Sequence, residues 1–72
     1  MNLSELKIGN FAKILDIHLE QEKLIMLYNM GIVPNIYIYA MCFNKLSGIF
    51  CVNSRLIALD KKIIKQIEIC YG

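Results

Sequence analysis

The chain has 72 residues, enough for one domain spanning residues 1–72 and too few for a second hydrophobic core. Its formal net charge of +2 is small, whereas nucleic-acid-binding domains usually carry a strongly basic face, so we expect no nucleic-acid partner. Hydrophobic residues make up 57% of the chain, against roughly 45–50% in an average domain. We therefore expect some apolar side chains to be exposed or to meet a partner.

Changes of hydrophobic period predict the first elements. Leucines three apart in Leu3–Leu6 predict one helical turn, and Gly9 breaks the chain after it. Apolar residues two apart predict a strand over residues 11–17. Ile17 is out of phase with the rest of this strand, which predicts a bulge near Asp16.

The stretch MGIVPN, residues 30–35, contains the strongest turn signal of the chain. Apolar residues spaced by three and four predict a helix over residues 21–30 just before it. Gly31 is expected to take the left-handed conformation that ends a helix. Pro34 cannot continue a helix and is expected to lead into the next strand.

The remaining strands are predicted from alternation and from β-branched and aromatic residues: they cover residues 35–43, 49–53 and 54–60, and a last one contains Ile67 and Ile69. The first two form a hairpin, and residues 61–64 are predicted as a single helical turn. We therefore predict a mainly β fold, a small five-stranded barrel with one short helix. Closure of the barrel would remove open sheet edges.

Alternation divides the apolar residues into an inward set and a remainder. The inward set is Leu3, Leu6, Ala12, Ile14, Ile17, Leu27, Met30, Ile32, Ile38, Ala40, Phe50, Val52, Ile57, Leu59, Ile64, Ile67 and Ile69. We predict that the remainder includes an exposed partner-binding face made of Met26, Tyr28, Tyr37, Tyr39 and Met41. The alternative is that the helix folds over the hairpin and covers part of this face. Without a partner, the face is expected to pair two copies of the chain weakly.

The cysteines are expected to be reduced thiols without a disulfide. Alternation places Cys42 on the inward face of its strand and Cys51 on the outward face, so the two are not expected to pair across the strands. Cys42 and Cys70 are interpreted as small buried apolar residues. No secretory signal precedes them, and the longest apolar run, residues 36–43, is far shorter than the ~20 residues of a membrane helix. We expect a cytoplasmic chain that does not itself span a membrane.

His18 is the only histidine, with Asp16 and Glu20 at alternate positions. Such a row offers ligands that divalent iron accepts, but one histidine and two acids from one strand make a poor site. We interpret the row as solvated polar residues and predict no metal site. No serine–histidine–acid or cysteine–histidine arrangement is apparent, and the glycines form no phosphate loop. We predict no cofactor and no enzymatic activity.

From about Leu3 to Ile69 the chain resembles the FeoA family of ferrous iron transport accessory proteins. The most recognisable family segment, a leucine, two variable residues, methionine or leucine, and then Gly-Ile-x-Pro-Gly, is matched by Leu27, Met30, Gly31, Ile32 and Pro34. Asn35 stands in place of the last glycine, and Ser54 in place of a glycine usual before a later strand. The resemblance implies a barrel like that of Src-homology-3 (SH3) domains.

The resemblance also implies a function, that of a cytoplasmic accessory or regulatory module that binds the membrane ferrous iron transporter FeoB by protein–protein contact. The alternative is a stand-alone metal-dependent regulatory module, because similar barrels form the C-terminal domain of iron-dependent repressors. Those repressors carry a winged helix first, and we predict no winged helix in these 72 residues.

Overall fold

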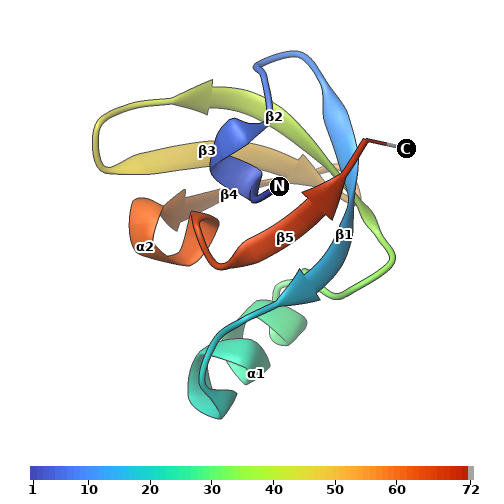
Figure 1. Cartoon of the computed structure of the whole chain (residues 1–72), viewed down its shortest axis with the longest axis vertical. Helices are drawn as coiled ribbons and strands as arrows, with labels where there is room; N and C mark the ends of the chain where they lie inside the picture. Colours follow the sequence, from blue (N-terminus) through green and yellow to red (C-terminus); the bar gives the residue numbers. More distant parts are fainter. Residues whose placement is uncertain (72) are drawn as a thin grey trace.

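The structure is a computed structural model that describes residues 1–71. Its elements in chain order are a 3₁₀ turn η1 (Leu3–Glu5), β1 (Phe11–Ile17), α1 (Gln21–Asn29), β2 (Tyr37–Phe43), β3 (Ser47–Val52), β4 (Arg55–Asp60), the single turn α2 (Lys61–Ile64) and β5 (Ile67–Cys70) (Figure 1). The mainly β fold is confirmed, and the predicted strand 11–17 and helix 21–30 agree with β1 and α1 to within one residue.

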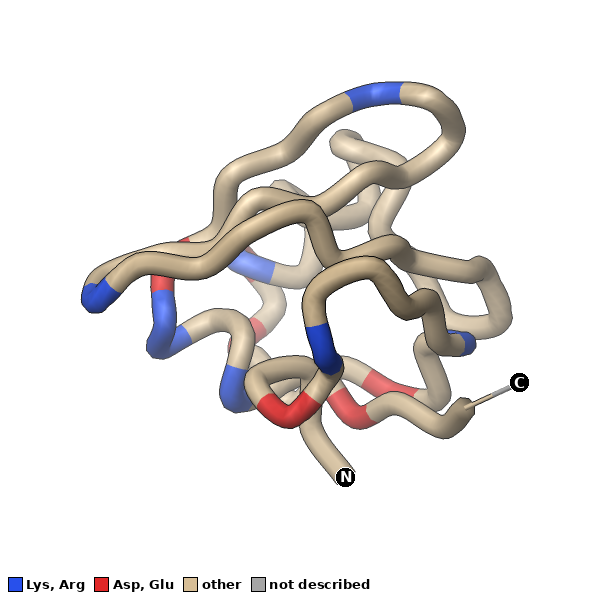
Figure 2. Tube along the Cα trace, turned by 90° about the horizontal axis from the view of Figure 1, so that it is seen from above, with Lys and Arg blue, Asp and Glu red and all other residues tan. Residues whose placement is uncertain are grey.

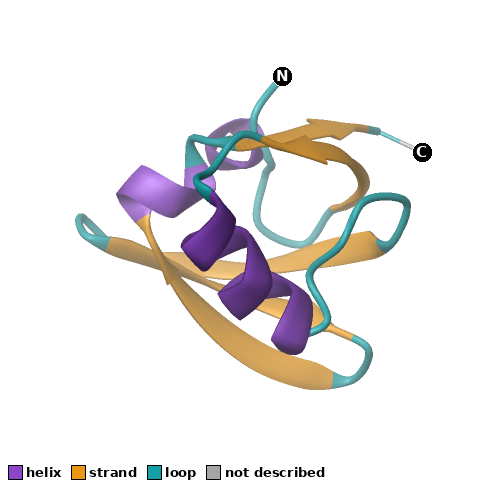
Figure 3. Ribbon diagram, turned by 90° about the horizontal axis from the view of Figure 1, so that it is seen from below, coloured by secondary structure: helices purple, strands orange, loops and turns teal. Residues whose placement is uncertain are grey.

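Within residues 1–71, five antiparallel strands form one sheet in the order β4-β3-β2-β1-β5. The sheet curls on itself, and α1 lies across one end of it (Figures 1 and 3). The bulge expected near Asp16 is present, since the register between β1 and β5 shifts between Ile14 and Asp16. Full closure is not found, because the strand order leaves β4 and β5 as edges. The carbonyl of Met1 accepts the N–H of Ile69 at 2.8 Å and so covers part of the β5 edge.

The interior of the curled sheet is filled by the inward residues of every element. Every member of the predicted inward set is buried except Met30, which is half-buried and packs against the core. Ile63 is also buried, although alternation did not assign it to the core. It lies in α2, where successive residues are about 100° apart around the axis, so Ile63 and Ile64 both reach the core.

A second bulge, on β2, overturns the expectation for Cys42. The register between β2 and β3 shifts between Ala40 and Cys42, and the additional residue reverses the alternation after it. Cys42 is therefore exposed, and Phe43 turns inward to pack edge-on against Phe50, with ring centroids 5.5 Å apart. Cys70 is half-buried instead of buried, because its neighbour on β5 takes the inward position. All three cysteines are free.

Gly31 ends α1 in the left-handed conformation, with φ +86°. Its N–H donates to the carbonyl of Tyr28 at 3.0 Å, and the N–H of Ile32 donates to the carbonyl of Leu27 at 2.9 Å. This pair of bonds defines a Schellman motif, which brings the residue after the glycine against the last turn of the helix. Leu27 and Ile32 are both fully buried, so the motif ends the helix and anchors it to the core.

The turn between β3 and β4 is fastened to the same end of α1. Asn53 and Ser54 have φ of 51° and 66°, as both central residues of a two-residue type I′ turn require. Nη2 of Arg55 then donates to the carbonyl of Met30 at 3.0 Å. This carbonyl belongs to the last turn of the helix, where backbone acceptors lack intrahelical partners.

Pro34 is separated from β2 by a turn. Asn35, which follows it, has φ 76°, a conformation that asparagine tolerates better than most residues. The N–H of Asn35 donates to the carbonyl of Ile14 at 2.7 Å, and the N–H of Ile14 donates to the carbonyl of Ile36 at 2.9 Å. The segment is therefore tied to β1 before β2 begins at Tyr37.

We expect Gly31→Val to lower the free energy of unfolding by more than about 1 kcal/mol, because a β-branched residue fits the left-handed region poorly. A Cβ at this position would meet Nη2 of Arg55 only at 3.4 Å, so the cost comes mainly from the backbone. Gly31→Asn is the control and should cost less. Urea unfolding of both variants checks this, and an equal loss in both would contradict it.

We expect Ser54→Gly to raise the free energy of unfolding by about 1 kcal/mol, because glycine takes a positive φ without the strain that serine bears. The control is Ser47→Gly, which adds a glycine within the strand β3 and should lower stability. Thermal and urea unfolding measure both changes. A loss of stability in Ser54→Gly would mean that the turn is not strained.

Candidate partner-binding surface

A row of apolar side chains crosses the outer face of the sheet. Phe11 of β1 lies opposite Tyr39 of β2, Tyr39 opposite Cys51 of β3, and Cys51 opposite Leu56 of β4. Directly opposite residues share one face of a sheet, with Cβ atoms about 4.5–5.5 Å apart. Phe11, Tyr39 and Leu56 are exposed, and Cys51 is half-buried. The four residues therefore form a continuous apolar strip over four strands.

Neighbouring residues widen this strip in both strand directions. Tyr37 packs edge-on against Phe11, with ring centroids 5.8 Å apart. Toward the other end of the strands lie Met41, which the β2 bulge keeps exposed, and Ile49 of β3. The outer apolar face is defined as Phe11, Tyr37, Tyr39, Met41, Ile49, Cys51 and Leu56.

Three of the five predicted site residues, Tyr37, Tyr39 and Met41, belong to the outer apolar face. All three are exposed, so α1 leaves these three side chains of the hairpin uncovered. Met26 and Tyr28 are also exposed. They flank the buried Leu27 on opposite sides of α1, because each helical residue is turned by about 100° from the last. They therefore cannot both join the outer apolar face. Their role in binding stays a prediction.

Phe11 and Leu56 are members of the face that the sequence did not single out. Alternation marks both as outward, since their neighbours Ala12 and Ile57 are buried. What alternation cannot supply is the order of strands in the sheet. Only that order brings Phe11 beside Tyr39 and Leu56 beside Cys51.

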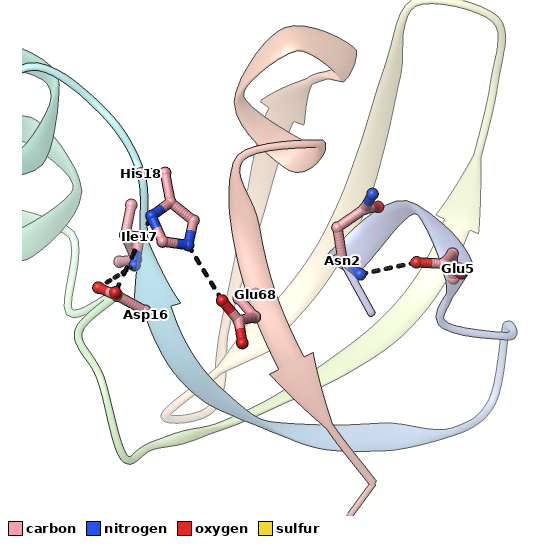
Figure 4. Close-up of polar contacts among 6 residues, drawn as sticks. All are labelled: Asn2, Glu5, Asp16, Ile17, His18 and Glu68. Carbon is pink, nitrogen blue, oxygen red and sulfur yellow. Dashed lines mark hydrogen bonds and ion pairs between the residues drawn. The ribbon is translucent and has the colours of Figure 1, made fainter.

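His18 follows β1 and reaches across to β5. Its Nε2 lies 3.0 Å from Oε1 of Glu68, and its Nδ1 lies 3.9 Å from Oδ2 of Asp16 (Figure 4). The hydrogen bond with Glu68 raises the pKa of His18, against a smaller opposing effect of desolvation and with help from the charges of Asp16 and Glu68. Glu68, which is distant in sequence, is therefore the carboxylate that lies nearest to His18.

Asp16, His18 and Glu68 form a contact on the surface of the protein. All three side chains are about half exposed. In the part of the chain that the structure describes, no group of three or more His, Cys, Asp or Glu side chains is placed to hold a metal ion. The absence of a functional metal site nevertheless stays a prediction.

The raised pKa of His18 predicts a small pH dependence of stability. A pKa that is higher in the folded chain than in the unfolded chain means that protonation favours the fold. This contribution is complete below the unfolded pKa of 6.5 and is lost as the pH rises through the folded value. The contribution of His18 to the free energy of unfolding, measured with urea, should therefore be slightly larger at pH 6 than at pH 8. His18→Gln should reduce this difference; an unchanged difference would assign it to other groups.

No helix within residues 1–71 is both long enough and apolar enough to cross a membrane.

Solved structures with the same fold include FeoA proteins and a repressor. The crystal structure of an iron uptake regulatory protein (FeoA) is 20% identical with a TM-score of 0.87, over 96% of this chain and 93% of that chain. The solution structure of the FeoA protein from Chlorobium tepidum is 22% identical with a TM-score of 0.91, over 99% of this chain and 70% of that chain. A manganese-dependent transcriptional repressor is 12% identical with a TM-score of 0.91, over 100% of this chain and 41% of that chain.

At these identities the similarity concerns the fold, and it confirms the expected SH3-like arrangement of strands. Among curated proteins, none matches the chain. The sequence profile of the FeoA domain family, in contrast, matches residues 1–70, nearly the whole sequence. The chain therefore belongs to the FeoA family, whose members take part in ferrous iron transport.

Proposed function

We propose that this chain is an accessory and regulatory module that binds the membrane ferrous iron transporter FeoB by protein–protein contact. The observation that carries the proposal is the outer apolar face, with Phe11, Tyr39 and Leu56 exposed in one strip. Contiguous exposed apolar patches mark interaction sites in small soluble domains. Membership of the FeoA family supports iron uptake as the process, and the family resemblance implies FeoB as the partner.

The proposed mode of action needs no chemical step. A module that binds one conformation of a transporter better than another shifts the transporter toward that conformation. Tyrosines suit such a surface, because the ring is buried by the partner while the hydroxyl stays hydrated. We propose that the chain has no catalytic group and no cofactor, and that it acts in the cytoplasm on the cytoplasmic part of FeoB.

A metal-dependent regulatory module is the second candidate. It is favoured by the likeness of the whole chain to part of a manganese-dependent transcriptional repressor, a likeness of fold alone. The two candidates differ in what the binding should depend on. Contact through the outer apolar face requires no metal, whereas a metal-dependent module should bind its partner only in the presence of a divalent cation.

The test uses the purified chain and the soluble cytoplasmic part of the FeoB encoded in the same genome, with binding measured by calorimetry. The double variant Tyr39→Ser/Met41→Ser should bind at least tenfold more weakly, a loss of about 1.4 kcal/mol or more. Its stability should change little, because both side chains are already exposed. Ile25→Ser is the control, since it removes an exposed apolar side chain from α1 and should leave binding unchanged.

A second double variant, Met26→Ser/Tyr28→Ser, shows whether α1 contributes to the docking surface. Adding Fe²⁺ or Mn²⁺, or a chelator, separates the two candidates. Unaltered binding of a well-folded Tyr39→Ser/Met41→Ser variant would reject the outer apolar face as the FeoB contact. Binding that appears only with the metal would favour the regulatory module.

A further inference from the structure

The edge of the sheet at β4 carries backbone groups that point away from β3. The two-residue turn places Arg55 opposite Val52, and in such a turn the N–H of the fourth residue donates to the carbonyl of the first. The N–H of Lys61 also points toward β3, because it donates to the carbonyl of Leu46 at 2.9 Å. Residues along an antiparallel strand bond to the neighbouring strand alternately. The odd-numbered residues from Arg55 to Lys61 therefore face β3.

The free edge of β4 is defined by the even-numbered residues Leu56, Ala58 and Asp60, whose N–H groups point the other way. Within residues 1–71, β4 has no sheet neighbour besides β3, and no hydrogen bond from another segment reaches the backbone of Leu56 or Ala58 or the N–H of Asp60. Buried backbone groups are nearly always paired, so these unpaired groups are hydrated. The three side chains are exposed as well, and β4 follows the margin of the sheet in Figure 3.

The opposite edge of the sheet, at β5, is covered by the start of the chain. The N–H of Ile69 donates to the carbonyl of Met1 at 2.8 Å, and Asn2 forms a bridge with Glu68. Proline, lysine and bulges are other common means of protecting an edge. The six residues of β4 include no proline or lysine and pair with β3 without a register shift. Charged residues stand only at the two ends of β4, and the positions between them are tan in Figure 2.

We propose that the free edge of β4 binds an extended segment of a partner protein as an additional strand of the sheet. This inference rests on the proposed function for the existence of a partner and adds the mode of contact. Unpaired N–H and C=O groups that repeat along a strand are matched by another extended backbone, whose groups repeat with the same spacing. In this mode of recognition the backbone bonds supply affinity, and side chains at alternate positions supply specificity.

Leu56 defines the side chain that the segment should present. It belongs to the outer apolar face, and 67% of its surface is exposed. A residue of the added strand directly opposite Leu56 would lie on the same face of the sheet, with Cβ atoms about 4.5–5.5 Å apart. An apolar residue there would extend the outer apolar face by one strand. Proline is excluded at positions that bond to β4, because it has no N–H.

A second copy of the chain fits the free edge less well. Two β4 strands that pair antiparallel over the whole free edge place Leu56 opposite Asp60 of the second copy, and Arg55 opposite Lys61 of the second copy. The first pair sets an apolar side chain against a carboxylate, and the second sets two positive charges side by side, which is unfavourable. A shift of register by two residues removes both conflicts but pairs Asp60 with Ser54, a turn residue with φ 66°.

The inference is tested by amide hydrogen exchange, measured by NMR on the unmodified chain. The probes are peptides selected from random sequences of about ten residues displayed on phage, and the cytoplasmic part of FeoB. In the free chain, the N–H groups of Leu56, Ala58 and Asp60 should exchange rapidly, and those of Ile57 and Leu59 slowly. Binding should slow the first group about tenfold or more, because only hydrogen-bonded amides are protected.

Ala58→Pro removes one N–H of the free edge and leaves the bonds to β3 intact, a place in a sheet where proline is tolerated. It should weaken binding of both probes at least about tenfold. The matched control is Ala58→Ser, which keeps the N–H and should change the affinity by less than about twofold. Melting curves, and slow exchange at Ile57 and Leu59, show whether each variant is folded.

Several results would overturn the inference. These are a selection without binding peptides, peptides that leave the amides of the free edge in rapid exchange, and equal affinity of folded Ala58→Pro and Ala58→Ser. A dimer in sedimentation that Ala58→Pro dissolves would identify a second copy as the occupant. Binding of FeoB with the free edge still in rapid exchange would reject the inference and leave the proposed function standing. Peptides that protect the free edge, with no binding of FeoB, would reject the proposed function and leave the inference standing.

Discussion

The position of β2 depends on the left-handed turn at Gly31. That turn drives Leu27 and Ile32 into the core together, and the second turn at Asn35 is then hydrogen-bonded to β1 at Ile14. β2 begins two residues after Asn35, so its register against β1 is set by this turn. Because side chains alternate with a period of two, a slip of one residue would send Ile38 outward and Tyr39 into the core. The outer apolar face therefore exists in its present form because of backbone geometry outside the sheet.

In this fold the turns matter more than usual for setting the strand register, because the hydrophobic pattern alone defines that register poorly. In most antiparallel sheets one face is apolar and the other polar, and this difference selects the register. On β2 and β3 both faces are apolar, with Ile38, Ala40 and Phe50 inside and Tyr39 and Ile49 outside. Positive φ at Gly31, Asn35, Asn53 and Ser54 supplies the information that the side-chain pattern lacks. The backbone strain at Ser54 is part of the free-energy cost of forming these turns.

The elements and the core could be predicted from the sequence, because both depend on local periodicity. Helical spacing around Leu27 and alternation around Ile38 each involve residues a few positions apart. The bulge at Met41 could not be predicted, since it depends on how Phe43 packs against Phe50 across the hairpin.

Strand order is also a property of the whole chain, and most of the candidate site depends on it. Tyr37, Tyr39 and Met41 could be recognised as outward on one strand. Placing them beside Phe11 and Leu56 depends on how four strands pair, which the sequence pattern does not give. The contact between His18 and Glu68 likewise requires that β1 and β5 be neighbours.

The pairing of β1 with β5 joins the first strand of the chain to the last. On the ribosome, β2, β3 and β4 emerge as a meander of short-range hairpins that can pair as soon as they are made, whereas long-range pairing is slow. Their inner face has no complete cover until Ile67–Cys70 has been synthesised and has found β1. During that interval the nascent meander is apolar on both sides and is open to non-native association. The outer face that equips the finished domain for a partner is therefore a hazard to the chain while it is being made.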